Sequence, residues 1–340
     1  MENRGDQAPQ IETGPQQTVS KPRVCQASEA QQIAVLGFGR SGTTWISDII
    51  SKVTGGLILF EPFHPSVTDM SQELSYAPIS PGNAQAIHGY LSDVLGKQHR
   101  KMWLMRNHVP VRLEEISPHF LDLIWDNCNV IGFKEIRANF MLRWLKQDLG
   151  CKIVYIVRHP CAVVSSILRR SNFWEFGWPG TYDIFLERTL HHPHYRNHRI
   201  NDCRSVIAGA TEAFEKYAVM WAITHAIVIP ELKSLGLPVF YYEEFYTNPF
   251  ESVRKLLDFI GVDKDNIHPA YIFTPSMTTL RTLHGLYGSE DLIRDGASIF
   301  WKDTLNISQF DRVTEIAQCF GIELYEMSGP HKDHARCSHH

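Results

Sequence analysis

The stretch IAVLGFGRSGTTWISDII, Ile33–Ile50, combines three local patterns that together predict the start of an α/β fold. The apolar run Ile33–Leu36 has the length and composition of a buried strand. A glycine-rich turn follows, and TTWISDIISKVTG then carries apolar side chains at helical spacing until Gly55 and Gly56 end the helix. The next apolar run, LILF, predicts a second strand. A strand, turn, helix and strand in this order open a parallel sheet.

The glycine-rich turn has the frame of a phosphate-binding loop, but its positive charge is displaced. Gly37 and Gly42 are separated by four residues, as in G-x-x-x-x-G-K-[ST], yet Thr43 stands where that motif has its lysine. The cation is Arg40, two residues before Gly42. A glycine turn that enters a helix presents backbone N–H groups to an anion, and the hydroxyls of Ser41, Thr43 and Thr44 add donors. The pattern predicts an anion site and disfavours a nucleoside triphosphate as its ligand.

Composition narrows the classes of protein to consider. The chain has 340 residues, of which 44% are hydrophobic and 21% charged, enough for a sizeable core. A net charge of −4 does not favour nucleic acid as a partner. Residues 1–32 and 326–340 are polar and predict a disordered tail and a flexible tail. Since no apolar leader or long apolar run is visible, we expect neither a signal peptide nor a membrane span, and a cytoplasmic location.

The seven cysteines form no C-x-x-C pair, and several of them lie in apolar runs. We therefore expect buried free thiols in a reducing compartment and not a disulfide framework.

Alternating strand and helix patterns continue along the chain and predict a single domain over residues 33–325. Further strands are expected at NVIGFKEI, KIVYIVRHP and LPVFYYEEF. Helices are expected at 138–150, 162–170, 211–229, 249–262 and 308–321, the last with Ser308 as its N-cap. Two segments, about 66–118 and 171–210, break the alternation, and the first has helical patches at 85–96 and 111–116. The sequence thus predicts a P-loop-type central parallel sheet flanked by helices, with two inserted segments that cap a substrate.

The segment GFGRSGTTWISDII resembles the 5′-phosphosulfate loop of sulfotransferases that use 3′-phosphoadenosine 5′-phosphosulfate (PAPS), in which a cation also precedes the glycine. This resemblance implies that PAPS is the donor, that no metal is required, and that Arg40 lies at the bridging oxygen of the phosphate–sulfate anhydride. It also implies that Trp45 stacks on the adenine, with Tyr217 or Trp221 as further aromatic contacts. The remaining donor-binding residues of the loop would be Ser41, Gly42, Thr43 and Thr44.

Two later segments resemble the same family. In KIVYIVRHPCAVVSSILRR, Arg158 and Ser166 match the arginine and serine of the 3′-phosphate site. An arginine at the carboxyl end of a strand and a hydroxyl in the next helix can grip one phosphate. In IRDGASIFWK, Arg294 and Gly296 match the R-K-G of cytosolic sulfotransferases, while Asp295 replaces the lysine of that motif. The resemblance therefore places donor contacts between residues 33 and 302.

The residues offer three candidates for the general base, because two histidines compete with a glutamate. Lys134 precedes Arg158 by 24 residues, as the lysine of the catalytic lysine–histidine strand does in cytosolic enzymes, but Ile136 occupies the histidine position. This makes His108, in MRNHVP, the less favoured base. His64 is a third possibility.

LFEPFHP and FKEIR resemble motifs of Golgi N-acetylglucosamine 6-O-sulfotransferases. In glycan-modifying enzymes a glutamate soon after the first helix acts as the base, so the resemblance implies this role for Glu61. Lys134 would then face the sulfonate oxygens and Arg40 the leaving phosphate. A carboxylate at a strand end near these two cations would stay ionised at neutral pH.

The sequence as a whole predicts a PAPS-dependent sulfotransferase that modifies a hydroxyl of a glycan, glycoconjugate or small alcohol. The residues leave two alternatives open, a divergent P-loop kinase or nucleoside triphosphatase and a non-catalytic protein that binds phosphoadenosine.

Overall fold

The computed structural model describes residues 30–67, 74–106, 109–169, 180–190, 199–262, 267–273 and 304–325. Within these residues the chain forms a seven-stranded sheet in the order β4-β3-β2-β5-β1-β6-β7. The strands are β1 (Gln31–Gly37), β2 (Leu57–Phe60), β3 (Trp103–Arg106), β4 (Val109–Arg112), β5 (Val130–Glu135), β6 (Lys152–Val157) and β7 (Val239–Tyr241). The predicted tails lie almost entirely outside the described residues.

Five neighbouring strands, β2, β5, β1, β6 and β7, pair in parallel, which confirms the predicted central parallel sheet. β3 and β4 extend it antiparallel beyond β2. These two strands fall inside the segment 66–118 that we expected to be an insertion with helical patches at 85–96 and 111–116. The first patch is α3 (Ala84–Leu95), but the second is the end of β4 followed by the 3-10 turn η2 (Leu113–Glu115). A strand at the edge of a sheet can be short and polar, so its sequence carries little periodicity.

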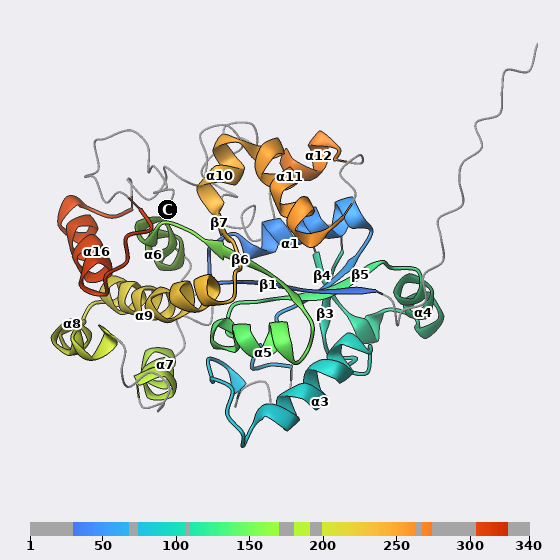
Figure 1. The fold of residues 1–340 in the computed structure, drawn as a ribbon, viewed down its shortest axis with the longest axis horizontal. Helices are drawn as coiled ribbons and strands as arrows, with labels where there is room; N and C mark the ends of the chain where they lie inside the picture. The colour runs from blue at the N-terminus through green and yellow to red at the C-terminus, as the bar shows by residue number, and fades with distance from the viewer. Residues whose placement is uncertain are drawn as a thin grey trace, which may run out of the picture.

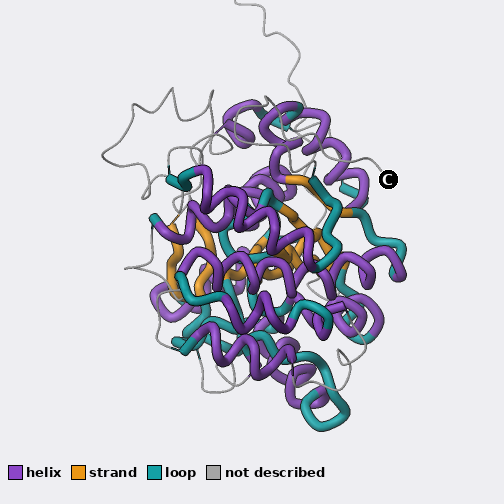
Figure 2. Tube along the Cα trace, turned by 90° about the vertical axis from the view of Figure 1, so that its left-hand side faces the viewer, coloured by secondary structure: helices purple, strands orange, loops and turns teal. Residues whose placement is uncertain are grey.

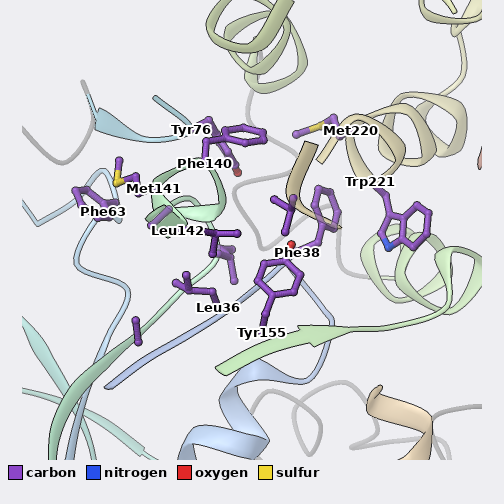
Figure 3. Packing of buried hydrophobic residues seen from close by; sticks show 14 of the residues in the cluster. Leu36, Phe38, Phe63, Tyr76, Phe140, Met141, Leu142, Tyr155, Met220 and Trp221 are labelled. Atoms are coloured by element: carbon purple, nitrogen blue, oxygen red, sulfur yellow. The ribbon is translucent and has the colours of Figure 1, made fainter. Parts of the chain in front are cut away.

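Helices cover both faces of the sheet, as Figures 1 and 2 show. One face carries α1 (Thr43–Thr54), α10 (Tyr242–Thr247), α11 (Pro249–Ile260) and α12 (Pro269–Phe273). The other carries α3, α4 (Pro118–Asp126), η3 (Asn139–Met141), α5 (Leu142–Gln147), α6 (Pro160–Leu168), α9 (Ala213–Ser234) and α16 (Ile307–Cys319). Successive residues of β1 point to opposite faces of the sheet, since Val35 belongs to one apolar core and Leu36 to the other. The larger core, seen in Figure 3, brings Leu36, Phe38 and Tyr155 of the sheet side together with Trp221 of α9.

Most expected elements are present, with shifted ends. LPVFYYEEF was expected to be one strand, but β7 ends at Tyr241 and α10 begins with the next residue. The last helix begins after Asn306, whose side chain accepts from the backbone N–H of Gln309, so the prediction of Ser308 as its N-cap is wrong. The described part of 171–210 holds α7 (Thr181–Leu190), η6 (Arg199–Asn201) and α8 (Arg204–Gly209), all against α9.

Candidate active site

Most predicted site residues of the described chain lie at or just beyond the carboxyl ends of four neighbouring parallel strands. Glu61 follows β2, Lys134 is near the end of β5, the glycine-rich loop follows β1, and Arg158 follows β6. The sheet order β2-β5-β1-β6 therefore sets these groups in a row. Three strand spacings of about 4.8 Å separate its two ends by roughly 14 Å. The row begins with a carboxylate beside an ammonium group and ends with guanidinium groups.

The loop between β1 and α1 has an unusual backbone. Arg40 (φ 70°) and Gly42 (φ 87°) both adopt left-handed conformations. At Gly42 only glycine fits, because a Cβ there would lie 2.2 Å from the ring of Tyr242 as well as carry the positive φ. No side chain caps the first turn of α1, and among the described residues the buried hydroxyl of Ser41 has no hydrogen-bond partner. The loop thus offers backbone N–H groups and a hydroxyl to a ligand.

Three predicted donor-binding residues come together at the β1–β6 end of the row. The Nε of Arg40 donates to the Oγ of Ser166 at 2.9 Å, and the Nη1 of Arg158 donates to the carbonyl of Arg40 at 3.0 Å. The guanidinium of Arg158 also lies over the ring of Tyr242, 4.3 Å from its centroid. Two guanidinium groups and a hydroxyl in one place form a site for a doubly charged anion such as a phosphate.

The turn that carries Arg158 is held by buried groups from three other elements. Nε1 of Trp221 donates to the Arg158 carbonyl at 3.2 Å, and the backbone N–H of His159 donates to Oε1 of Glu243 at 2.9 Å. The hydroxyl of Tyr325 donates to the other oxygen of Glu243 at 2.9 Å. Trp221 is fully buried in this role, and its stacking on adenine stays a prediction.

A cluster of four buried charges lies at the β2–β5 end of the row; we call it the charge cluster and define it as Glu61, Lys134, Glu135 and Arg137. Oε1 of Glu61 accepts from Lys134, and its Oε2 accepts from Nη1 of Arg137 at 3.1 Å. Nη1 of Arg137 also donates to Oε1 of Glu135 at 3.0 Å. Two positive and two negative groups balance, which is how such charges can be buried together.

The charge cluster controls the protonation of Glu61. Burial alone would raise the pKa of this carboxyl, but Lys134 and Arg137 outweigh it and lower the pKa to about 2. Glu61 is therefore ionised at neutral pH, as expected, although its second cation is Arg137 and not Arg40. Glu135 fixes the segment after β2, because its Oε2 accepts from the backbone N–H of Phe63 at 2.6 Å.

A sequence model of the sulfotransferase domain matches residues 30–329, nearly nine tenths of the chain. The chain belongs to the sulfotransferase family. As a member of this family it is an enzyme that uses PAPS as its sulfonate donor, which confirms the class predicted from the glycine-rich loop. The loop fits such a donor, because the unpartnered Ser41 hydroxyl and the uncapped start of α1 are groups that a phosphosulfate can bind.

Solved sulfotransferase structures resemble this one at low sequence identity. The sulfotransferase domain from the curacin biosynthetic pathway is 14% identical over 86% of this chain and 98% of that chain, with a TM-score of 0.44. The sulfotransferase domain from the Synechococcus PCC 7002 olefin synthase is 15% identical over 87% and 96%, with a TM-score of 0.43. Mouse sulfotransferase SULT7A1, solved with PAP, is 15% identical over 86% and 88%, with a TM-score of 0.40. No curated protein sequence matches the chain.

In this sulfotransferase the other predicted site residues are placed as follows. Trp45 packs against Tyr242 and Tyr246, and its Nε1 donates to the carbonyl of Ile272 at 3.2 Å, so its ring is part of an aromatic group beside the loop. His64 is partly exposed, and its ring meets that of Trp103 edge-on at 5.2 Å. The predicted residues His108, Arg294 and Gly296 lie outside the described residues.

Glu135 and Arg137 were not singled out from the sequence. The signal that could have found them is in FKEIR itself, which places charged residues where a strand buried on both faces would carry apolar ones. Charged groups there must find partners, so Glu135 and Arg137 could have been expected to pair with opposite charges close by.

None of the helices in the described part of the sulfotransferase combines the length and the apolarity that a bilayer span requires.

Proposed function

We propose that this sulfotransferase transfers the sulfonate group of PAPS to a hydroxyl of a glycan or glycoconjugate, with Glu61 as the general base. The observation that carries the proposal is the row at the sheet edge. It sets a carboxylate, an ammonium group, an anion loop and a guanidinium pair side by side along β2, β5, β1 and β6. In-line group transfer needs a base, a group that neutralises the transferred charge and a cradle for the leaving group in such a sequence.

Each group in the row has a separate task. The bound donor supplies the sulfonate group and departs as 3′,5′-adenosine bisphosphate. Lys134 faces the sulfonate oxygens, while Arg40 and the loop stabilise charge on the leaving phosphate. Cations of this kind lower a barrier by about 2–4 kcal/mol each. Arg158 and Ser166 hold the 3′-phosphate, and the proton of the acceptor hydroxyl passes to Glu61.

Glu61 needs a rearrangement before it can accept that proton. Both of its oxygens accept hydrogen bonds, it is 0% exposed, and a carboxylate with a pKa of about 2 is a weak base. We infer that Lys134 turns from Glu61 to the sulfonate when the donor binds. Oε1 of Glu61 then becomes available and its proton affinity rises, while Arg137 continues to hold Oε2. Binding of the donor would in this way make Glu61 able to act as the base.

The surface next to Glu61 supports a polyhydroxylated acceptor. Phe60, which precedes Glu61, pairs with Trp103 of β3 across the sheet. The guanidinium of Arg112 lies over the partly buried ring of Trp103, 5.1 Å from its centroid, and His64 meets the same ring. An aromatic face bordered by hydrogen-bonding groups suits a sugar ring. The resemblance of LFEPFHP to glycan 6-O-sulfotransferases supports the same acceptor class.

The test begins with the donor site. Titration with 3′,5′-adenosine bisphosphate is expected to raise the melting temperature by mass action, and ATP is expected to raise it far less. A rise in melting temperature with ATP and Mg²⁺, but none with the bisphosphate, would instead favour a kinase. Turnover is then measured with PAPS and a panel of N-acetylglucosaminides, other glycosides, phenols and simple alcohols. Sulfonation of phenols but of no sugar would reject the glycan acceptor while leaving the donor assignment in place.

A further inference from the structure

Two cysteines from distant parts of the chain touch each other outside the active site. Cys203 directly precedes α8, and Cys319 is the last residue of α16. Their sulfur atoms are 2.8 Å apart, and the thiol of Cys203 also donates to the carbonyl of Cys319 at 3.0 Å. A disulfide bond is about 2.05 Å long, so less than 1 Å of further approach separates the two sulfurs from bonding distance.

The other described cysteines have partners of a different kind. The thiol of Cys128 donates to the carbonyl of Trp125, and that of Cys151 lies 3.9 Å from the side-chain oxygen of Gln32. Cys161 is buried beside Thr314. Among the described cysteines the sulfur–sulfur contact is thus made by Cys203 and Cys319, which are 116 residues apart in the chain.

We propose that Cys203 and Cys319 are a modification site at which a small disulfide such as oxidised glutathione forms a reversible intramolecular disulfide. In the first step the thiolate of Cys319 attacks one sulfur of glutathione disulfide, and one reduced glutathione leaves. In the second step Cys203 loses its proton and attacks the Cys319 sulfur, and the second glutathione leaves. The two protein thiols lose two electrons and two protons, and glutathione disulfide gains both.

Exposure sets the order of these steps. Cys319 is exposed and can meet a solute, whereas Cys203 is 1% exposed. Burial and the neighbouring thiol raise the pKa of Cys203 to about 12, so this thiol is a poor first nucleophile. Once Cys319 carries a glutathione, the sulfur in contact with Cys203 is the one it attacks. The intramolecular step needs no diffusion and is favoured over a second glutathione from solution.

The bond would join the segment 199–209 to the C-terminal helix. Both α8 and α16 pack on α9, and they lie near the same end of it in Figure 1. Closing a loop of this length removes entropy from the unfolded chain, and the expected rise in melting temperature is on the order of 5–10 °C. Residues 320–325, which follow Cys319, end in the Tyr325 that binds Glu243 beside Arg158, so the bond also anchors a support of the donor site.

The experiment treats the full-length protein with glutathione disulfide, blocks remaining thiols with iodoacetamide and maps tryptic peptides by mass spectrometry. The expected product is INDCR (Ile200–Arg204) linked to VTEIAQCFGIELYEMSGPHK (Val313–Lys332). The intact mass falls by about 2 Da, and dithiothreitol reverses both changes. Cys203→Ser abolishes the linked peptide and the rise in melting temperature, whereas the control Cys151→Ser keeps both.

Two outcomes would overturn the proposal, and neither depends on a variant that folds. One is a stable mixed disulfide of Cys319 with glutathione while Cys203 stays alkylated by iodoacetamide. The other is a link from Cys319 to Cys337 or Cys25 in the wild-type protein.

Discussion

Replacing Glu61 by glutamine tests the charge cluster and the proposed base together. The change keeps the size of the side chain but removes its charge, and Lys134 and Arg137 are left with Glu135 as the one negative partner in the charge cluster. Glu61 has its pKa lowered from 4.5 to about 2, which corresponds to about 3 kcal/mol of stabilisation at pH 7. Breaking a buried pair typically costs 3–5 kcal/mol. The melting temperature should therefore fall by roughly 6–20 °C.

The stabilisation by Glu61 has a defined pH window. Because the folded pKa is depressed, the contribution is complete above about pH 4.5 and is lost as the pH falls towards 2. The difference between wild-type protein and Glu61→Gln should thus be full at pH 7 and should shrink below pH 4.5.

A double-mutant cycle separates the structural effect from the catalytic one. Lys134→Met alone leaves the carboxylates in excess, but Glu61→Gln with Lys134→Met leaves Arg137 and Glu135 as a balanced pair. The double variant should be more stable than additivity predicts by about 1–3 kcal/mol, measured by urea unfolding. Turnover with PAPS should nevertheless be reduced 10²–10⁴-fold both in Glu61→Gln and in the double variant. The affinity of both variants for 3′,5′-adenosine bisphosphate should stay within roughly threefold of the wild-type affinity. Glu115→Gln, at an exposed site, is the matched control.

Two results would refute this reasoning. Strict additivity of the two stability losses would show that Glu61 and Lys134 do not stabilise each other. Turnover at the wild-type rate in Glu61→Gln would remove Glu61 as the base, and a loss of turnover in His64→Gln with Glu61 intact would transfer the role to that histidine.

Three further predictions follow from other parts of the site. Arg158→Ala should weaken 3′,5′-adenosine bisphosphate about 10–100-fold in calorimetric titrations but adenosine 5′-phosphosulfate, which has no 3′-phosphate, far less; equal losses would reject the 3′-phosphate assignment. Gly42→Ala should lower the melting temperature and abolish bisphosphate binding, and Tyr242→Leu in the same chain should recover part of the stability, since the new Cβ meets that ring. Burial lowers the pKa of His159 and His225 to about 4 each, so stability should be full above pH 6.5 and fall as the pH approaches 4. The two histidines alone should lower the free energy of unfolding by about 4 kcal/mol at pH 5, measured by urea unfolding. A urea midpoint that does not change with pH would contradict this.

Local patterns predicted where some of the candidate residues lie, and the reason is geometric. Arg40, Ser41 and Gly42 follow a buried strand directly, and parallel strands carry such loops to one edge of the sheet, so their gathering could be foreseen. Arg158 was foreseeable for the same reason. The direction of a long side chain could not be foreseen in this way. Arg40 was expected near Glu61, but its side chain donates to Ser166, 126 residues away in the chain.

Buried charges show the same division. Nothing in the spacing of FKEIR says that Arg137 bridges Glu61 and Glu135, because the contact depends on the register of β2 against β5. The strands β3 and β4 were likewise missed, since each has four residues, too few to show a clear period, and β4 lies at the edge of the sheet.

The sequence by itself predicted the parallel sheet and the glycine-rich loop, because apolar periodicity and a glycine turn act over a few neighbouring residues. The class of reaction came from the resemblance of three segments to the sulfotransferase family. Only the tertiary structure decided which cation neutralises Glu61, which hydroxyl Arg40 binds and that Cys203 meets Cys319. These contacts join residues from about 70 to more than 120 positions apart, and their energies depend on how deeply the groups are buried and on where the side chains point. The order of residues along the chain specifies neither the burial nor the side-chain direction.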